Sequence, residues 1–271
     1  MSASTSGSRA GAPGPRVKSS RDGGIVTVTL DHPGKMNVLD QAGWEALGEV
    51  FEGLAGDDSV RCVIVEGAGE AAFSAGSDIS GFAAHRSTPG QVARYAAALR
   101  RGIEGVWDCP HPTVAAVRGM CVGGGLIIAA CCDVRVCGES SRFGAPVNRL
   151  GATMAYEEMA PLLAAAGAGA VLEILLTGDL VDARRAREMG IVNRIEPDGA
   201  VGEGAGEIAR RIAAGAPLVN RWHKKFVRRA GEGRPLTEAE REEAYEAFRT
   251  GDYREGIAAF MEKRAPRFEG E

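Results

Sequence analysis

The stretch 117–132, VRGMCVGGGLIIAACC, constrains this chain more than any other. Three consecutive glycines, Gly123 to Gly125, separate two apolar segments, and the second segment stays uncharged until Asp133. Glycine lets a backbone approach a ligand closely and adopt positive φ angles. If a helix begins here, the N–H groups around 124–126 are its unpaired first-turn donors. Such donors can bind an anion or an oxygen that becomes anionic. A tight turn into a buried helix is the alternative interpretation.

Strand and helix patterns alternate through the first two thirds of the chain. β-branched and apolar runs predict strands at 24–31, 60–65, 112–117 and 133–137, with a short last strand at 191–195. Helical spacing predicts one helix from Asp40, as N-cap, to about Leu54 and another over 91–107, and 67–79 has the composition of a loop. This alternation favours an α/β fold with crossover connections.

Helix signals replace strand signals towards the C-terminus. Asp182 and Gly190 mark the two ends of one helix. Beyond residue 201 the pattern is helical, with breaks at Pro217 and 231–235. Two capping boxes, Thr237-x-x-Glu240 and Asp252-x-x-Glu255, predict further helix starts. The chain therefore divides into a disordered tail over 1–16, an α/β core over 17–197 and a C-terminal helical region over 198–271.

Composition limits the partners. The 271 residues carry a formal net charge of −4 with both signs interspersed, which argues against nucleic acid as the main partner. The longest apolar runs, near 112–117 and 121–132, are shorter than the roughly 18 residues of a membrane span. The first 15 residues lack the apolar region of a signal peptide. The six cysteines lie mostly in apolar runs without metal-site spacing, which predicts core thiols in a reducing cytoplasm.

A second glycine-containing turn, AFSAGSDI at 72–79, follows a predicted strand as the triple glycine follows 112–117. Two turns of this kind, each after a parallel strand, can direct their N–H groups into one cleft at the carboxyl ends of the strands. Two N–H donors that converge on one carbonyl oxygen form an oxyanion hole.

Five segments resemble, in the right order, the signatures of the crotonase superfamily, which is the enoyl-CoA hydratase/isomerase family. They are VTLDHPGKMNVLD at 28–40, AFSAGSD at 72–78, the stretch 117–151, LLTGDLVDARRAREMGIVNRI at 175–195, and GIAAFMEKRAPRFEG at 256–270. The resemblance covers roughly residues 17–268. It implies a crotonase-like (ClpP/crotonase) spiral of ββα units, an acyl-CoA thioester as substrate, and neither a metal nor a cofactor beyond the coenzyme A of the substrate.

The same resemblance implies roles for particular residues. The backbone N–H groups of Ser77 and Gly124 match the oxyanion donors, which hold the thioester oxygen as it becomes an enolate. The matched positions along the CoA path are Lys35, Met36 and Ala75, with Phe260 and Lys263 reaching the CoA of a neighbouring subunit. A homotrimer or homohexamer is implied, with the C-terminal region covering the site. Ordinary surface lysines and core packing of the phenylalanine are the alternatives.

The chain departs from the family at both positions where its hydratases carry a glutamate. Three residues after the middle glycine stands Ile127, and after the proline of FGAPV stands Val147. Neither side chain can move a proton. Because general acid–base catalysis contributes roughly 10²–10⁴-fold per group, we expect hydration to be slow.

Glu157 and Glu158, at a predicted helix start with Tyr156 beside them, are the candidates for a replacement acid or base; a helix start enriched in glutamate is the alternative. Other polar residues have smaller expected roles: substrate hydrogen bonding for Asn148, a turn or N-cap for Asp78, a solvated loop for His85, and structure for His32, His111 and His223. The sequence thus predicts an enzyme of the lyase or isomerase class, with double-bond isomerisation favoured over efficient hydration. A catalytically inactive acyl-CoA binder of the same fold is the alternative.

Overall fold

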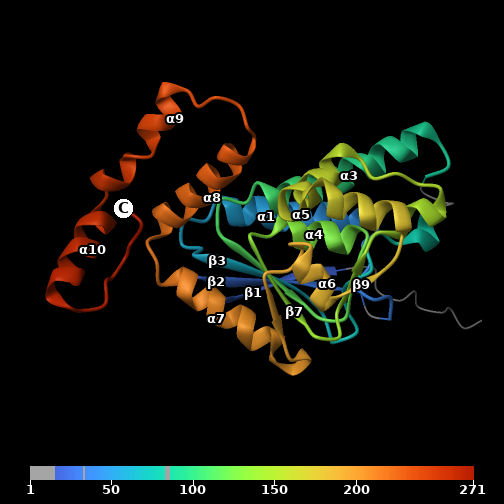
Figure 1. Ribbon diagram of the computed structural model, residues 1–271, viewed down its shortest axis with the longest axis horizontal. Coiled ribbons are helices and arrows are strands. Elements are labelled where there is room, and N and C mark those ends of the chain that lie inside the picture. The colour runs from blue at the N-terminus through green and yellow to red at the C-terminus, as the bar shows by residue number, and fades with distance from the viewer. Residues whose placement is uncertain (1–15, 33, 83–85) are drawn as a thin grey trace, which may run out of the picture.

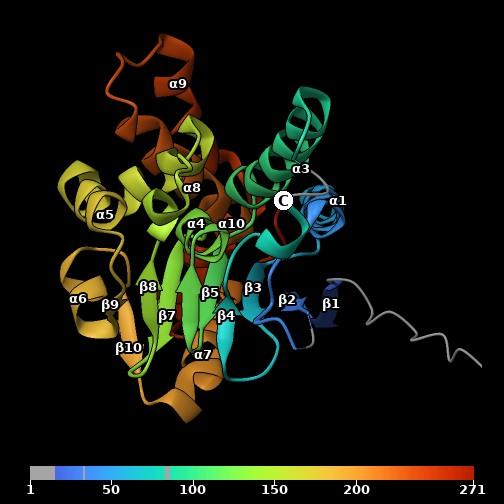
Figure 2. The same cartoon turned by 90° about the vertical axis from the view of Figure 1, so that its right-hand side faces the viewer.

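The computed structural model describes residues 16–32, 34–82 and 86–271. Its strands form two sheets with helices on both sides (Figures 1 and 2). The larger sheet has the spatial order β1 (Arg16–Asp22), β2 (Ile25–Asp31), β3 (Cys62–Gly67), β5 (Thr113–Val117), β7 (Val134–Gly138) and β10 (Arg194–Glu196). The smaller sheet has the order β4 (Ala72–Ser74), β6 (Met120–Val122), β8 (Arg142–Gly144) and β9 (Val181–Asp182).

From β3 to β8, consecutive strands alternate between the two sheets. β3, β5 and β7 pair in parallel in the larger sheet, and each is followed at once by β4, β6 or β8, which pair in parallel in the smaller one. β1–β2 and β8–β9 are the antiparallel pairs. Each turn of the chain therefore adds one strand to each sheet before its helix, which is the expected spiral of ββα units.

Helices cover both faces of the larger sheet. The α-helices within the described residues are α1 (Gln41–Ala55), α3 (Pro89–Trp107), α4 (Gly124–Cys131), α5 (Tyr156–Thr177), α6 (Ala183–Glu188), α7 (Val201–Ala213), α8 (Pro217–Gly231), α9 (Glu238–Glu243) and α10 (Gly251–Glu262). The main core lies between the sheet and α1, α3 and α4, where Trp44, Phe51 and Ile127 are fully buried. α7 packs its buried alanines on the opposite face (Figure 2). The predicted boundary near residue 197 falls just before this helix.

The caps confirm several predicted helix ends. Asp40 accepts a hydrogen bond from Gly43 N–H, Asp182 accepts one from Arg185 N–H, and Thr237 forms its capping box with Glu240. All six cysteines are buried and free, as expected for core thiols. Burial raises the pKa of the Cys62 thiol to about 12, so it stays protonated.

Other sequence predictions are wrong. The residues 67–79 are not all loop, because β4 lies within them, and β1, β6, β8 and β9 were not predicted. Asp252 does not cap a helix: α10 begins after Thr250, whose side chain accepts from Tyr253 N–H. The buried Asp252 carboxylate instead accepts hydrogen bonds from Glu269 and Gly270 N–H and so holds the C-terminal segment. Residues 1–15 of the predicted tail lie outside the described residues, and residue 16 begins β1.

The apolar run 159–172 is longer than the runs the sequence analysis identified as longest. It lies in α5, which is long and apolar enough to cross a membrane by length and composition alone. The core helix of a soluble protein passes the same test, and α5 buries Leu162, Val171 and Ile174 in the main core. Gly167 has φ 73° and interrupts the helix. The opposite side of α5 exposes apolar side chains, including Leu172 and Leu176.

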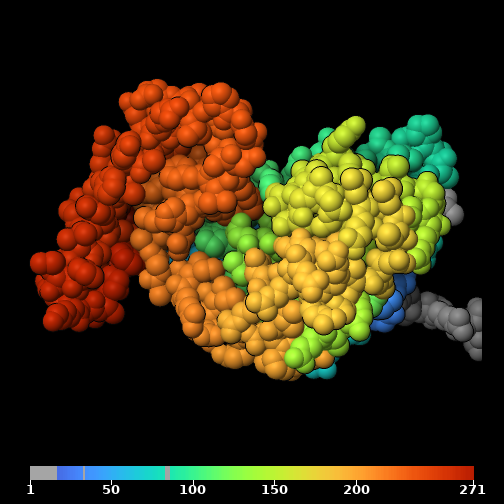
Figure 3. Space-filling model, in the orientation of Figure 1, coloured from blue at the N-terminus to red at the C-terminus, as the bar shows by residue number. Residues whose placement is uncertain are grey.

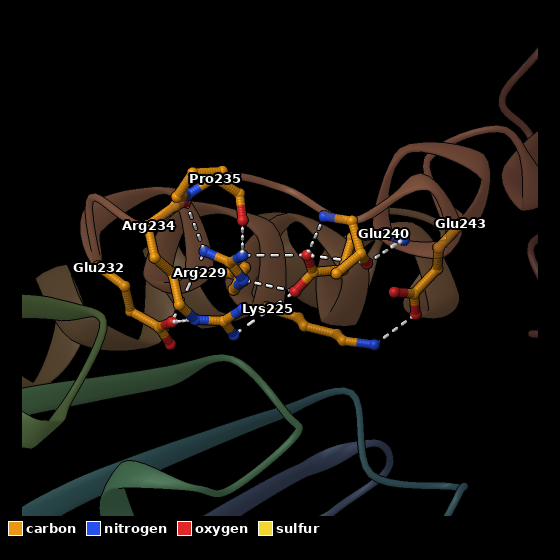
Figure 4. Close-up of polar contacts among 8 residues, drawn as sticks. Lys225, Arg229, Glu232, Arg234, Pro235, Glu240 and Glu243 are labelled. Carbon is orange, nitrogen blue, oxygen red and sulfur yellow. Dashed lines mark hydrogen bonds and ion pairs between the residues drawn. The ribbon is translucent and has the colours of Figure 1, made fainter.

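The C-terminal helices extend away from the sheets and form a separate lobe (Figure 3). Ion pairs join α8 to α9, where Arg229 binds Glu240 and Lys225 binds Glu243 (Figure 4). The hydrogen bonds from Arg229 lower the pKa of Glu240 to about 2, so this link persists at neutral pH. These basic residues of α8 are thus paired within the chain.

Asn37 fixes the turn that precedes α1. This buried side chain accepts a hydrogen bond from His32 N–H at 3.1 Å and donates to the carbonyl oxygens of Ala68 and Ala72 at 3.0 and 2.8 Å. Its backbone oxygen accepts from the Ser74 hydroxyl at 2.8 Å. The turn is therefore tied to the segment that leads into β4.

We predict that Asn37→Gly destabilises the fold by roughly 2–4 kcal/mol, because it leaves three backbone groups, two of them in buried hydrogen bonds, without these partners. Glycine tolerates the φ of 53° at this position, so the loss of stability measures the missing hydrogen bonds and not backbone strain. Met36→Gly is the matched control, since Met36 has φ 48° but an exposed side chain, and we expect a change within about 1 kcal/mol. Urea unfolding measures both, and equal stability of the two variants would contradict the role of Asn37.

Candidate active site

The two glycine-containing turns meet in the structure. A Cβ atom built on Gly76 would lie 2.7 Å from the backbone nitrogen of Gly124, and one built on Gly124 would lie 3.3 Å from the Cα of Gly76. Gly76 also has φ +90°, a backbone conformation that residues other than glycine rarely adopt. Parallel pairing of β4 with β6 places these turns side by side. Only glycine lets the two backbones come this close.

Each turn presents one free N–H group. The N–H of Leu39 donates to the carbonyl oxygen of Gly76, and the carbonyl oxygen of Leu39 accepts from the N–H of Asp78, both at 2.8 Å. Leu39 therefore bonds to the residues on either side of Ser77 and leaves the N–H of Ser77 itself unbonded. Gly124 is the first residue of α4, where a helix leaves its N–H without an internal partner. Within the described residues, neither Ser77 N–H nor Gly124 N–H has a hydrogen-bond acceptor. Both residues line one cavity.

This cavity has a volume of about 150 Å³. Its walls come from the turn after β4, the segment leading to α3, the start of α4, the 3-10 helix Pro146–Leu150 and the start of α5. Larger hollows of about 840 and 720 Å³ lie along the C-terminal helices. They are lined by ion-paired residues such as Arg229 with Glu240 and Arg264 with Glu255, so the smaller cavity is the candidate site.

Neither of the two apolar replacements offers a carboxylate to the cavity. Ile127 is fully buried in α4 and does not line it, whereas Val147 does. The cavity lining therefore has no acid or base at position 147, and position 127 does not contribute to it.

The structure separates the two candidate glutamates. Glu158 lines the cavity, and its carboxylate accepts a hydrogen bond from Ala155 N–H at 2.6 Å. Burial raises the pKa of Glu158, against the opposing effects of that hydrogen bond and of the Arg86 charge. Glu157 does not line the cavity and forms an ion pair with Arg100 at 3.2 Å. Tyr156 is 88% exposed.

Sequence reasoning missed Arg86, which also lines the cavity. Its guanidinium carbon lies 3.8 Å from the ring centroid of Phe82 and 3.6 Å from that of Tyr95. The two rings themselves meet edge to face, with centroids 5.9 Å apart. An arginine in the segment after the first glycine turn was the only signal in the sequence, but its contact with Tyr95 of α3 depends on the tertiary fold.

The residues predicted along the CoA path lie beside Ser77. Ala75 lines the cavity, and its N–H donates to the oxygen of Met36 at 2.9 Å. Lys35 Nζ lies 2.8 Å from the carboxylate of Asp78. Asp78 caps a short 3-10 helix, Ile79–Gly81, as expected. Burial would raise the pKa of Asp78, but hydrogen bonds from Lys35 and Ser80 lower it overall, which keeps the ion pair charged.

The other candidates lie elsewhere. Phe260 is 81% exposed on α10 and Lys263 ends that helix; neither lines the cavity, and α10 lies at the far end of the molecule (Figure 1). Asn148 donates to the oxygen of Leu176 at 2.9 Å. His85 lies outside the described residues. His32 and His111 each bind a backbone oxygen, and His223 is a residue of α8. The described part of the chain holds no group of three potential metal ligands.

The contact between the two turns leads to a prediction. In Gly76→Ala, the positive φ costs about 1–2 kcal/mol of stability, and the clash of the new methyl group with Gly124 costs about 1–3 kcal/mol more. Gly69→Ala is the control, because Gly69 has φ +74° and an added methyl group there would meet nothing within 4 Å. We expect Gly76→Ala to lower the free energy of unfolding by more than Gly69→Ala does. Equal losses in urea unfolding would mean that the turns are free to separate.

Comparison with known proteins identifies the family. A sequence model described as enoyl-CoA hydratase/isomerase matches residues 20–271. The chain is 33% identical over 262 residues to the carnitinyl-CoA dehydratase of Salmonella typhi, covering 92% of this chain and 97% of that protein. It is 30% identical over 246 residues to the short-chain-enoyl-CoA hydratase of Clostridium acetobutylicum, covering 90% of this chain and 94% of that protein.

Solved structures give the same result. The enoyl-CoA hydratase/carnithine racemase of Magnetospirillum magneticum has a TM-score of 0.91 and 44% identity, covering 94% of this chain and 96% of that chain. The enoyl-CoA hydratase of Bacillus anthracis has a TM-score of 0.87 and 30% identity, covering 96% of this chain and 100% of that chain. These neighbours establish a crotonase fold. By its match over nearly its whole length, the chain belongs to the enoyl-CoA hydratase/isomerase family.

Proposed function

We propose that this protein is an enzyme that binds an acyl-CoA thioester and stabilises its enolate through the N–H groups of Ser77 and Gly124. The observation that carries the proposal is the pair of unpaired N–H groups on two touching turns that line one cavity. A preorganised donor of this kind is worth roughly 3–4 kcal/mol to a developing oxyanion. The start of α4 adds the positive end of a helix dipole.

We assign proton transfer to Glu158. The carboxylate takes a proton from the α-carbon of a 3-enoyl thioester, and the electron pair moves towards the thioester oxygen between the two N–H groups. The same proton then returns to the γ-carbon, which gives the 2-enoyl thioester. The position of Glu158 in the cavity and its pKa, which burial raises, support this role, because a higher pKa makes the carboxylate a stronger base. Glu157 is engaged by Arg100 outside the cavity.

Isomerisation is proposed over hydration because hydration needs two groups acting on water and on the α-carbon. Ile127 and Val147 occupy the positions of the two usual glutamates, and one carboxylate remains in the cavity lining. The same replacements favour the second candidate function, a catalytically inactive acyl-CoA binder. Turnover of a 3-enoyl thioester separates the two.

Assembly and CoA binding complete the proposal. We assign the CoA path to Lys35, Met36 and Ala75, which lie beside Ser77. We also propose a homotrimer or homohexamer in the cytoplasm, with Phe260 and Lys263 reaching the CoA of a neighbouring subunit. The exposed apolar side chains of α5 and α10 support an assembly, because they have no cover within the described chain.

We predict that Glu158→Gln slows the isomerisation of a 3-enoyl thioester by about 10²–10⁴-fold at saturating substrate, because glutamine can still accept the Ala155 N–H bond but cannot carry the proton. Glu157→Gln is the matched control and keeps its activity. Since the base acts when ionised, kcat/KM of the wild type falls as the pH drops through a pKa above 4.5. Full activity of Glu158→Gln would remove it from the mechanism.

We also predict slow hydration of crotonyl-CoA, at least about 10²-fold below a family hydratase that has both glutamates, because the acid–base pair is missing. The loss of absorbance of the conjugated thioester measures the rate, and binding of the same thioester is measured in parallel. Efficient hydration would show that another group has replaced the two glutamates. Binding without any turnover, of 3-enoyl thioesters as well, would favour the inactive binder.

A further inference from the structure

The side chain of Arg86 brings a positive charge to the candidate active site. Glu158 lines the same cavity, and the Arg86 charge opposes the rise of its pKa, but the two side chains form no ion pair. Its Nε atom is buried without a hydrogen-bond partner, and within the described residues its guanidinium forms no ion pair. Arg221 also has an unpartnered Nε, but its guanidinium binds Asp58 at 2.7 Å. Among these buried, unpartnered atoms, that of Arg86 belongs to a residue lining the cavity.

Aromatic rings hold this guanidinium in place. Phe82 and Tyr95 lie 3.8 and 3.6 Å from its central carbon, and the Tyr95 ring is buried on α3. Cation–π contacts of this kind stabilise and orient the cation, but they do not neutralise it. Arg86 is half-buried, and its Nε is fully buried, so the cation is partly desolvated. A partly desolvated cation favours an anion beside it, which a ligand can supply here.

The nearby carboxylates are already engaged. Glu158 lines the same cavity, but its carboxylate binds Ala155 N–H at 2.6 Å and forms no ion pair with Arg86. Glu157 pairs with Arg100 outside the cavity. Glu158 also adds a negative charge, so an incoming anion is attracted only if it lies directly on the guanidinium. The planar fork of arginine meets this requirement, because it binds a carboxylate through two parallel hydrogen bonds.

We infer that the preferred substrate is a short acyl-CoA whose acyl group ends in a second carboxylate, bound by Arg86. This inference rests on the function proposed above. The cavity volume of about 150 Å³ favours a short acyl group, since pockets for larger ligands typically hold roughly 300–1,000 Å³. A carnitinyl group, with its fixed trimethylammonium charge, would place like charges together. The chemistry therefore separates this chain from the carnitinyl-CoA dehydratase to which it is similar.

Paired ligands test the inference by titration calorimetry. Glutaryl-CoA and hexanoyl-CoA have acyl chains of similar length, and only the first ends in a carboxylate. We expect the wild type to bind glutaryl-CoA about 10- to 100-fold more tightly, as for a charge-assisted hydrogen-bonded pair. Arg86→Gln abolishes this preference and changes hexanoyl-CoA binding less than about twofold, and Arg86→Lys, which keeps the charge without the fork, retains part of it. Arg94→Gln, which changes an exposed arginine of α3, is the control and leaves both affinities unchanged.

The outcomes are distinguishable. Equal wild-type affinity for both thioesters overturns the inference and leaves the proposed function standing. An equal weakening of both by Arg86→Gln, in a variant that melts at the wild-type temperature, means that Arg86 contacts the CoA phosphates, which also overturns it. If the wild type binds neither thioester, the proposed function fails, and the inference fails with it.

Discussion

The contact between the backbones of Gly76 and Gly124 is the constraint on which the rest of the site depends. It brings together two segments that are far apart in sequence, and it requires that neither carries a side chain. Alternation of consecutive strands between two sheets makes the contact possible, because β4 and β6 become parallel neighbours. The Trp44 ring packs against Gly124 at this contact, since a Cβ atom on Gly124 would lie 2.7 Å from the ring. The two N–H donors are therefore set by the packing of α1 against α4, as well as by the turns themselves.

This arrangement divides the electrostatic work of the proposed reaction between backbone and side chain. The start of α4 and the N–H of Ser77 supply fixed positive ends of dipoles where charge would develop on the thioester oxygen. Glu158 supplies a group whose charge changes, and burial holds its pKa above the ordinary value. Fixed dipoles need no reorganisation when the charge forms, and their effect is larger beside a dry core such as that around Ile127 than in water.

Local patterns allowed much of the fold to be predicted, and tertiary contacts explain what was missed. The central strands β3 and β5 have nearly continuous apolar runs, and the helix start at Gly124 follows from glycines next to apolar residues. β1 was missed because RVKSSRD is polar, and it forms as an edge strand by pairing with β2. Asp252 was misread as a cap because its partners, Glu269 and Gly270, come from the C-terminal segment. In the site, the turns were predicted from glycine, whereas Arg86 takes its position from Phe82 in its own segment and from the Tyr95 ring on α3.

In the proposed function, Val147 and Arg86 both affect the net charge of the cavity, because both line it. A carboxylate at position 147 would add a second negative charge there and would repel a second carboxylate on the substrate. Position 127 does not line the cavity, so Ile127 has no direct part in this effect. With Val147, the described lining holds one carboxylate, Glu158, for the proposed proton transfer, and one cation, Arg86, for the inferred anionic acyl group. On this view an apolar residue at position 147 affects substrate charge preference as well as reaction type, because both depend on the net charge within a small, partly desolvated space.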